Sequence, residues 1–592
     1  MNKVSTRADI ITRRSYCRPT NEEATVFETW EEVVARVIRH QKWLWERALT
    51  HMVIPGVPLH DVTEDLLEWI SLTNTQKDEL EELRKLMLAR KALPSGRTLW
   101  LGGTNIAKTR EASMFNCSST KVETVYDLVD TFWLLLQGCG IGATPKIGTL
   151  NGFRKQIKEL KIIPSTKAMS DGKGREHNEE DFVDGIWTIS VGDSAEAWAK
   201  SLGKLMAGKY KAETLVLDFS EIRASGIRLK GYGWISSGYK PLSVAYTAIF
   251  DIMNNKAGNL LSFIDLVKII NWMGTVLSSR RSAEIIGCDY NDPEWKDFAT
   301  FKRDCFEETH QYKQQSNNSL MFHHKPSRNE LINIFDMMID SGGSEPGFIN
   351  IETAKKRAPW TNFVNPCGEI LLGNKGFCNL VEIDVGKFIG DTAGLHNAAT
   401  IIARANYRQT VVDLRDGILQ EAWHKNNEFL RLCGVGATGI AKRGDMTEFD
   451  WKNLKYSAVC GTKGMATELG LEYPKNTTTV KPSGTLGKIM DTTEGVHKPE
   501  GKYLFNWVTF GAHDPIVDKL LDAGYYMLDK PGTTDKSIIA CLPVKYDNID
   551  FDKKEVTRKD GTIEILDVNL ETAIEQLERY KKIQVYYCDQ NV

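Results

Sequence analysis

The chain has 592 residues, of which 42% are hydrophobic and 26% charged, and its formal net charge is −3. Such values are typical of a globular protein of about four ordinary domains, or of one large α/β barrel with attachments, and they give no reason to expect binding to nucleic acid or to a membrane surface. The polar N-terminus has no signal-peptide pattern, and no apolar run is long enough to span a bilayer. Eleven scattered cysteines, an odd number, indicate a reducing cytoplasm rather than a disulfide scaffold.

The first ninety residues are predicted to be mainly helical. About twenty polar residues come first and are expected to be flexible or loosely docked. Apolar residues then recur at helical spacing over residues 28–50 and again from 78 to 93, where Pro94 ends the pattern. We therefore place an N-terminal helical region at residues 1–92 and the main domain at residues 93–592.

A short apolar-to-polar run at residues 114–119 is interpreted as the end of a strand and contains Cys117. By itself, one such cysteine is most simply a buried structural residue. An apolar helix is predicted over residues 124–137, followed by a glycine cluster at 138–142. This cluster lacks the acidic residue that a dinucleotide-binding fingerprint requires, so we expect it to permit a close approach of backbone near the active site.

Residues 150–180 are the most polar part of the chain and are interpreted as a solvated insertion with flexible loop, within an insertion region at 150–212. A buried strand is predicted at 215–222 and a helix at 264–277. Two loops that follow these elements carry cations whose charge suits phosphate, although cations of this kind are equally a surface feature. The four cations are Arg228, Lys230, Arg280 and Arg281.

The stretch with the most candidate catalytic residues is Asn365–Leu380. It places Cys367 and Glu369 two residues apart, and Cys378 follows eleven positions after the first cysteine. The proline and glycine that flank Cys367 predict a tight loop, able to hold a thiol, an amide and a carboxylate around one small reacting group. The local sequence leaves a second interpretation open, a turn between two strands with an incidental buried cysteine.

Two helices are predicted after this loop, at residues 396–411 and 412–432. The G-x-G-x-x-G at residues 434–439 has no clear βαβ context, so we do not interpret it as a nucleotide fold. Residues 477–488 combine a strand-forming run, a Pro-Ser-Gly-Thr turn and a helix start. Backbone N–H groups and hydroxyls in such a turn form a natural phosphate cradle, without a Walker A pattern.

Asn-Pro-Cys-Gly-Glu followed by a second cysteine at this spacing resembles the active-site loop of the ribonucleotide reductases. The chain is most similar to their adenosylcobalamin-dependent (class II) branch, and within it to the monomeric ribonucleoside-triphosphate reductases. The likeness runs from about residue 14 to the last residue and includes Thr-Val-Lys-Pro-Ser-Gly-Thr at 479–485. It implies a ten-stranded α/β barrel with Cys367 on a central finger loop, and the reduction of ribonucleotides to 2′-deoxyribonucleotides for DNA precursor synthesis.

The resemblance also implies roles for individual residues. Cys367 would form a thiyl radical that removes the ribose 3′-hydrogen, Glu369 would accept the 3′-hydroxyl proton, and Asn365 would orient the ribose hydroxyls. Cys117 and Cys378 would supply two electrons by closing to a disulfide. The implied substrate-binding residues are Asn116, Ser118, Pro482, Ser483, Gly484 and Thr485.

The implied ligands and partners are adenosylcobalamin with its cobalt, a ribonucleoside triphosphate, and thioredoxin or a similar dithiol. A deoxynucleotide effector is also implied, held by the insertion and by the four cations named above. Three alternatives were weighed: the large subunit of a class I reductase, a glycyl-radical enzyme, and a non-catalytic nucleotide-binding paralogue. No ATP-cone or glycyl-radical motif is apparent, and the intact set of cysteines, Asn365 and Glu369 argues against the paralogue.

The last residues, Tyr586–Val592, are interpreted as a buried strand. In the family this segment continues through a final strand into a mobile tail that carries a cysteine pair. We therefore expect the C-terminal strand and tail to be missing, and a separately encoded C-terminal piece would then be a partner. The alternative is a natural minimal enzyme that is reduced directly by an external thiol.

Overall fold

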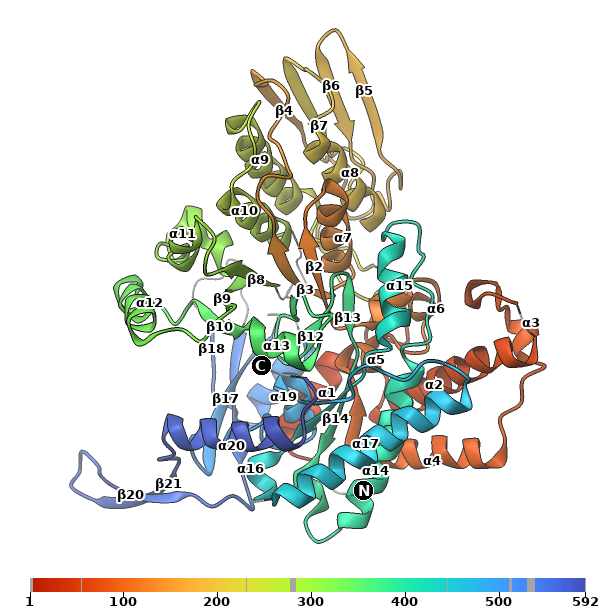
Figure 1. Cartoon of the computed structure of the whole chain (residues 1–592), viewed down its shortest axis with the longest axis vertical. Coiled ribbons are helices and arrows are strands. Elements are labelled where there is room, and N and C mark those ends of the chain that lie inside the picture. Colours follow the sequence, from red (N-terminus) through yellow and green to blue (C-terminus); the bar gives the residue numbers. More distant parts are fainter. Residues whose placement is uncertain are drawn as a thin grey trace.

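The structure is a computed structural model. It describes residues 4–590 apart from 55, 230, 277–283, 445, 511–513 and 530–537. Two central sheets lie between a helical layer and an upper sheet, and a smaller C-terminal sheet with a projecting hairpin lies below (Figure 1). No helix among these residues is long and apolar enough to cross a membrane. The fold is mixed α/β, as predicted.

A four-stranded sheet forms the lower half of the centre. Its last three strands run parallel, and the first is antiparallel to its neighbour. Val381 and Ile383 point from it into a core shared with the N-terminal helices. In sheet order its strands are β1 (Ala92–Pro94), β14 (Leu380–Asp384), β15 (Gly434–Thr438) and β16 (Thr478–Val480).

The helices that cover this sheet start at side-chain caps. A capping box, in which a threonine hydroxyl and an acidic or amide side chain satisfy each other's backbone N–H groups, begins α2, α4 and α17. The predicted helices at 28–50 and 396–411 are thus present with somewhat different ends. The covering helices are α1 (Thr6–Tyr16), α2 (Trp30–Val53), α4 (Asn74–Leu88), α14 (Thr392–Arg408) and α17 (Glu448–Glu468).

The prediction of a loosely docked N-terminus was wrong. Helix α1 is packed into the core, where Ile10 and Ile11 are buried. The buried guanidinium of Arg7 donates to the Asn506 side chain at 2.9 Å, a partner 499 positions away. A polar sequence can therefore be fixed when its charged groups find partners on distant strands.

A six-stranded sheet forms the upper half of the centre. All neighbouring strands run parallel except β13, which is antiparallel to β2. Cys117 begins β2 rather than ending a strand, and helices α7 (Val125–Leu136) and α10 (Phe263–Gly274) pack on the sheet. In sheet order the strands are β10 (Gly347–Asn350), β9 (Ser316–Phe322), β8 (Glu284–Asp289), β3 (Gly140–Pro145), β2 (Cys117–Val122) and β13 (Gly376–Cys378).

The two central sheets do not close into a hydrogen-bonded barrel within the described residues. The chain passes from β13 in one sheet directly to β14 in the other at Asn379. The side-chain amide of Asn379 donates to the carbonyl of Asn406 instead of extending a ladder. The ring of ten strands that the resemblance implies is therefore not seen as a continuous sheet.

The polar insertion contributes three strands to a sheet, and residues 164–178 between the first two of them are irregular and mostly exposed. These strands pair with the predicted strand near 215. The resulting sheet stands above the six-stranded sheet, beside α8 (Ala195–Ala207) and α9 (Tyr239–Asn255) (Figure 1). One face of this sheet packs on the main core through Trp187 and Ile189. Its strands, in sheet order, are β4 (Glu159–Ile163), β7 (Thr214–Asp218), β6 (Ile186–Ser190) and β5 (Glu179–Val183).

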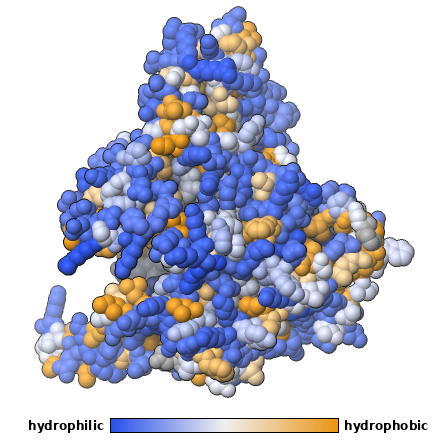
Figure 2. All heavy atoms as spheres, in the orientation of Figure 1, coloured by the Kyte–Doolittle hydropathy of each residue, from blue (hydrophilic) through white to orange (hydrophobic). Residues whose placement is uncertain are grey.

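The C-terminal part corrects two further predictions. A helix was predicted at 412–432, but residues 412–420 are irregular and only α15 (Glu421–Leu430) is helical. A strand was predicted from Tyr586 onward, but α20 (Ala573–Tyr586) is a helix and residues 587–590 after it are irregular. The hairpin of β20 (Asp552–Thr557) and β21 (Ile563–Val568) projects at lower left, where hydrophobic residues lie on the surface (Figure 2). The sheet next to it contains β17 (Tyr503–Phe510), β19 (Ile538–Lys545) and β18 (Met527–Asp529).

Candidate active site

The predicted reactive loop is the tip of a short hairpin between the two central sheets, formed by β11 (Phe363–Val364) and β12 (Leu371–Leu372). Two glycines allow the hairpin to lie this close to both sheets. A Cβ on Gly142 of β3 would lie 2.0 Å from the Val364 carbonyl oxygen. A Cβ on Gly434 of β15 would lie 3.2 Å from the Ile370 side chain. The expected close backbone approach at the 138–142 cluster is thus confirmed.

The loop is held by its own polar groups. Gly368 has φ of +75°, a conformation that favours glycine, and its N–H donates to the Asn365 carbonyl at 2.8 Å. The Asn365 side-chain oxygen accepts from the N–H of Ile370 at 2.9 Å, and its amide donates to Glu369 Oε2 at 2.7 Å. This arrangement leaves Cys367 exposed at the tip, while Asn365 and Glu369 are buried.

Three thiols meet at this tip. Cys117 and Cys378 are directly opposite each other on β2 and β13, and both are buried free cysteines. The Cys117 thiol lies close enough to the Cys367 and Cys378 thiols to interact with both. The contact with Cys117, together with the charge of Glu369, raises the pKa of Cys367 well above its usual range. The thiol is therefore neutral, which disfavours nucleophilic chemistry and preserves its S–H hydrogen.

Buried charges surround the thiols, and sequence reasoning missed most of them. Lys481 Nζ lies 3.3 Å from Glu369 Oε1, and a Cβ on Gly436 of β15 would lie 2.5 Å from the Lys481 Cβ. Burial raises the pKa of Glu382 to about 7 against the opposing effect of Lys481, and burial likewise raises the pKa of Asp384 to about 6. The sequence signal for Lys481 was a cation next to the Pro-Ser-Gly-Thr turn.

The Pro-Ser-Gly-Thr turn precedes α18 (Gly484–Ile489), as predicted. Ser483 caps that helix with φ of +69° and is buried, while Pro482, Gly484 and Thr485 are exposed. The turn directly follows Lys481, which contacts Glu369, so the turn begins near the thiol loop.

Asn116 and Ser118, the substrate-binding residues predicted around Cys117, lie at the start of β2. Ser118 lies on the opposite face of β2 and donates its hydroxyl to the Gly140 carbonyl at 2.9 Å. Asn116 is half-buried just before the strand, and its carbonyl accepts from the Gly140 N–H. Ser119 shares the face of Cys117 and is buried, and the alternation of the strand is the signal that could have found it.

Of the proposed effector cations, only Arg228 lies within the described residues, since Lys230, Arg280 and Arg281 fall outside them. Arg228 lines a cavity of about 730 Å³ between the insertion and the chain segment around residues 227–237. The cavity is also lined by Arg110, Arg223, Tyr232 and Trp234.

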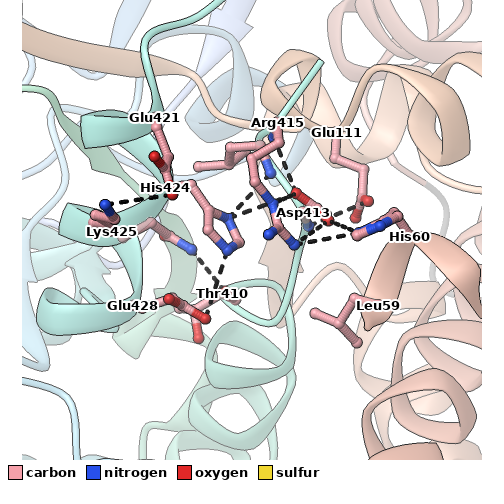
Figure 3. Close-up of polar contacts among 12 residues, drawn as sticks. Leu59, His60, Glu111, Thr410, Asp413, Arg415, Glu421, His424, Lys425 and Glu428 are labelled. Carbon is pink, nitrogen blue, oxygen red and sulfur yellow. Dashed lines mark hydrogen bonds and ion pairs between the residues drawn. The ribbon is translucent and has the colours of Figure 1, made fainter. Parts of the chain in front are cut away.

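A second polar network lies outside the thiol site and fixes the irregular segment 409–420 (Figure 3). Asp413 accepts hydrogen bonds from Arg415 at 2.7 Å and contacts His60 Nδ1 at 2.8 Å. Its N–H donates to Glu111, and Leu414 N–H donates to His424. Although burial acts in the opposite direction, Arg415 and His60 lower the pKa of Asp413 below its usual range. The network joins the N-terminal region to α15.

Comparison with known proteins shows which enzymes the chain is similar to. No protein-family model matches the chain. An adenosylcobalamin-dependent ribonucleoside-triphosphate reductase of Lactobacillus helveticus is 26% identical, over 98% of this chain and 83% of the relative. The enzyme of the same name from Lactobacillus acidophilus is 28% identical, over 87% of this chain and 76% of the relative. The chain is a homologue of these ribonucleotide reductases.

The fold agrees with that assignment. The crystal structure of a B12-dependent (class II) ribonucleotide reductase superposes with a TM-score of 0.78 at 22% identity, covering 98% of this chain and 86% of that one. In this chain Cys367, the buried thiols of Cys117 and Cys378, and Glu369 thus lie together in a fold similar to that of the solved reductase.

Proposed function

We propose that this chain reduces ribonucleotides, as triphosphates, to 2′-deoxyribonucleotides through a thiyl radical on Cys367, with adenosylcobalamin as cofactor. The observation that carries the proposal is the meeting of one exposed thiol with two buried thiols that are opposed across two strands. A radical-forming thiol must be reachable from outside, whereas a reducing pair must stay close together. The exposed Cys367 meets the first requirement, and the buried, opposed Cys117 and Cys378 meet the second.

The exposed Cys367 thiol is the group to which the cofactor must have access, and its exposure fits that requirement. The chemistry that adenosylcobalamin supplies when bound is homolysis of its cobalt–carbon bond, which provides the radical. The protein contributes a neutral S–H at Cys367. Cys117, Ile370 and Cys378 belong to a buried apolar cluster beside the loop.

The remaining steps use the residues of the loop and the thiol pair. The Cys367 thiyl takes the 3′-hydrogen of the ribose, and Glu369 accepts the 3′-hydroxyl proton. The 2′-hydroxyl leaves as water after it takes a proton from the Cys117–Cys378 pair. The pair loses two protons and two electrons as it forms a disulfide, so one dithiol is consumed for each ribose reduced. Cys367 then returns its hydrogen to the 3′ carbon, which regenerates the thiyl radical, and Glu369 returns the proton to the 3′ oxygen.

Substrate phosphates are proposed to bind at the start of α18. Gly484 and Thr485 are exposed there, and the positive φ of Ser483 turns the backbone at the cap, where N–H groups at a helix start can receive phosphate. Lys481 adds a positive charge next to the turn. The four-stranded and six-stranded sheets, ten strands in total, are proposed to act as the two halves of the barrel around the finger loop.

A deoxynucleotide effector is proposed to bind in the cavity next to Arg228. Its volume of about 730 Å³ lies in the range of small-molecule sites. Tyr232 and Trp234 offer aromatic faces for a base, and Arg110 and Arg223 offer cations for phosphates. The active-site disulfide is proposed to be reduced by an external dithiol through thiol exchange.

The test is an assay of purified protein with adenosylcobalamin, a small dithiol and each ribonucleoside triphosphate, in which the deoxynucleotide product is measured. Cys367→Ser should abolish product while nucleotide binding is retained, because a serine O–H is too strong to form the corresponding radical readily. Product formation that does not depend on adenosylcobalamin would favour a class I large subunit instead. Measurable turnover by Cys367→Ser would remove that residue from the mechanism.

A further inference from the structure

Lys481 is a buried cation next to the proposed base, and none of the reaction steps above uses it. It follows β16, and its side chain is about one-eighth exposed, whereas that of Glu369 is almost fully buried. Burial alone would lower the pKa of Lys481, but Glu369, Cys367 and Glu382 together raise it above its usual range. The side chain is therefore an ammonium group within the site.

Two carboxylates compete for this ammonium. Glu369 Oε1 lies 3.3 Å from Lys481 Nζ. Glu382, in the middle of β14, faces the same interior and interacts with Lys481 electrostatically. The other groups that face Glu369 are the Asn365 amide and the three cysteine thiols, and none of these carries a positive charge. Among the described residues around Glu369, Lys481 is thus the source of positive charge.

We propose that Lys481 is a positioning residue that stabilises the negative charge of Glu369 and holds its carboxylate beside the finger loop, ready to accept the 3′-hydroxyl proton. A carboxyl removed from water favours its neutral form, and a neutral carboxylic acid cannot act as a base. The two oxygens of Glu369 have separate partners, since Oε2 accepts from Asn365 at 2.7 Å while Oε1 faces Lys481. Asn365 orients the carboxylate, and Lys481 stabilises its charge.

The backbone is shaped to admit this lysine. Residue 436 of β15 is glycine, and a Cβ at that position would lie 2.5 Å from the Lys481 Cβ and 3.2 Å from the Val381 carbonyl oxygen. The lysine therefore lies against the bare backbone of the neighbouring strand. This contact supplies a way to displace the ammonium without removing it.

The inference rests on the proposed function, and the experiment separates the two. Deoxynucleotide formation is measured from about pH 5.5 to 9 for the wild type, Lys481→Met, Lys481→Arg and Gly436→Ala. Lys452→Met, an exposed lysine on α17, serves as the matched control. A nearby opposite charge displaces a carboxyl titration by about one to three pH units, so Lys481→Met should move the acid limb of the kcat profile upward by that amount.

Lys481→Arg should restore the position of the acid limb, and Gly436→Ala should move it in the same direction as Lys481→Met. Far-ultraviolet circular dichroism checks the fold of each variant, and the arginine and Gly436 variants keep the test decisive if the methionine variant does not fold. An acid limb that stays in place when Lys481 is neutral or displaced would overturn the inference. An inactive wild type would instead overturn the proposed function.

Discussion

Replacing Glu382 by glutamine is expected to stabilise the protein above neutral pH relative to the wild type. Glu382 is fully buried in the middle of β14. Burial raises its pKa from the ordinary 4.5 to about 7, and Lys481 opposes this rise only in part. Glutamine has nearly the same shape as the protonated carboxyl group and cannot ionise, so it preserves the state that the folded protein prefers.

The magnitude follows from linkage. Below pH 4.5 the carboxyl is protonated in both the folded and the unfolded chain. Between 4.5 and about 7 the folded chain keeps the proton that the unfolded chain has released, so the free energy of unfolding falls as the pH rises. One pH unit corresponds to about 1.4 kcal/mol, which gives a loss of roughly 3 kcal/mol across this window, most of it between about pH 5 and 8. Glu382→Gln should not show this loss.

The assay is denaturant unfolding of the wild type and Glu382→Gln at pH 5 and pH 8, with infrared titration of the protonated carboxyl band. The difference in unfolding free energy should shift by about 2–3 kcal/mol in favour of the variant at the higher pH. Glu82→Gln, on the exposed face of α4, should change stability equally at both pH values. An equal effect of Glu382→Gln at both pH values, or a carboxyl band that is still present in the variant with its intensity unchanged, would refute the reasoning.

Three further outcomes are expected. Cys378→Ser should bind nucleotide but fail to turn over repeatedly with a dithiol, whereas Cys460→Ser, on the exposed face of α17, should cycle normally; equal rates would remove Cys378 from the reducing pair. Ser483→Ala combined with Thr485→Ala should weaken nucleotide binding in calorimetry, by about 1.5–3 kcal/mol for each charge-assisted hydrogen bond lost, and unchanged affinity would exclude this turn from the site. Asp413→Asn should lower the unfolding free energy at pH 7 by about 2–3 kcal/mol. The difference from the wild type should become smaller as the pH falls and the aspartate loses its charge, and a constant difference down to acid pH would contradict the ion-pair account.

The local elements of the site could be predicted from the sequence because their signals are local. The Pro-Cys-Gly run predicts a tight turn, and the strand-forming run at Thr477–Val480 with the Pro-Ser-Gly-Thr turn after it predicts a strand followed by a helix start. Both predictions are confirmed at β16, at α18 and in the finger-loop hairpin. The opposition of Cys117 and Cys378 came from the family resemblance alone, since the register between two distant strands is not encoded at either cysteine.

The errors have a shared physical cause in non-local partners. Residues 412–420 have an apolar pattern of helical type, yet Asp413 and Asp416 bind backbone N–H groups of their own segment and hold it irregular. The N-terminal residues are polar, yet Arg7 and Ser5 find partners almost 500 positions away. Aromatic and β-branched residues near Tyr586 suggested a strand, although α20 begins upstream at a capping box formed by Thr572 and Glu575.

The buried charges of the site also depend on contacts between distant segments. Glu382, Lys481 and Glu369 come from a strand, from the residue after another strand, and from the finger loop. Of these, only Glu369 was predicted from its own segment to belong to the site. Only the assembled structure buries all three together, with one ammonium between two carboxyl groups. Burial, more than any neighbouring charge, raises the pKa of Glu382 to about 7, so Glu382 gives up its charge more readily than an ordinary glutamate. The charge on Glu369 is then balanced by Lys481, which is the condition that proton abstraction from the ribose requires.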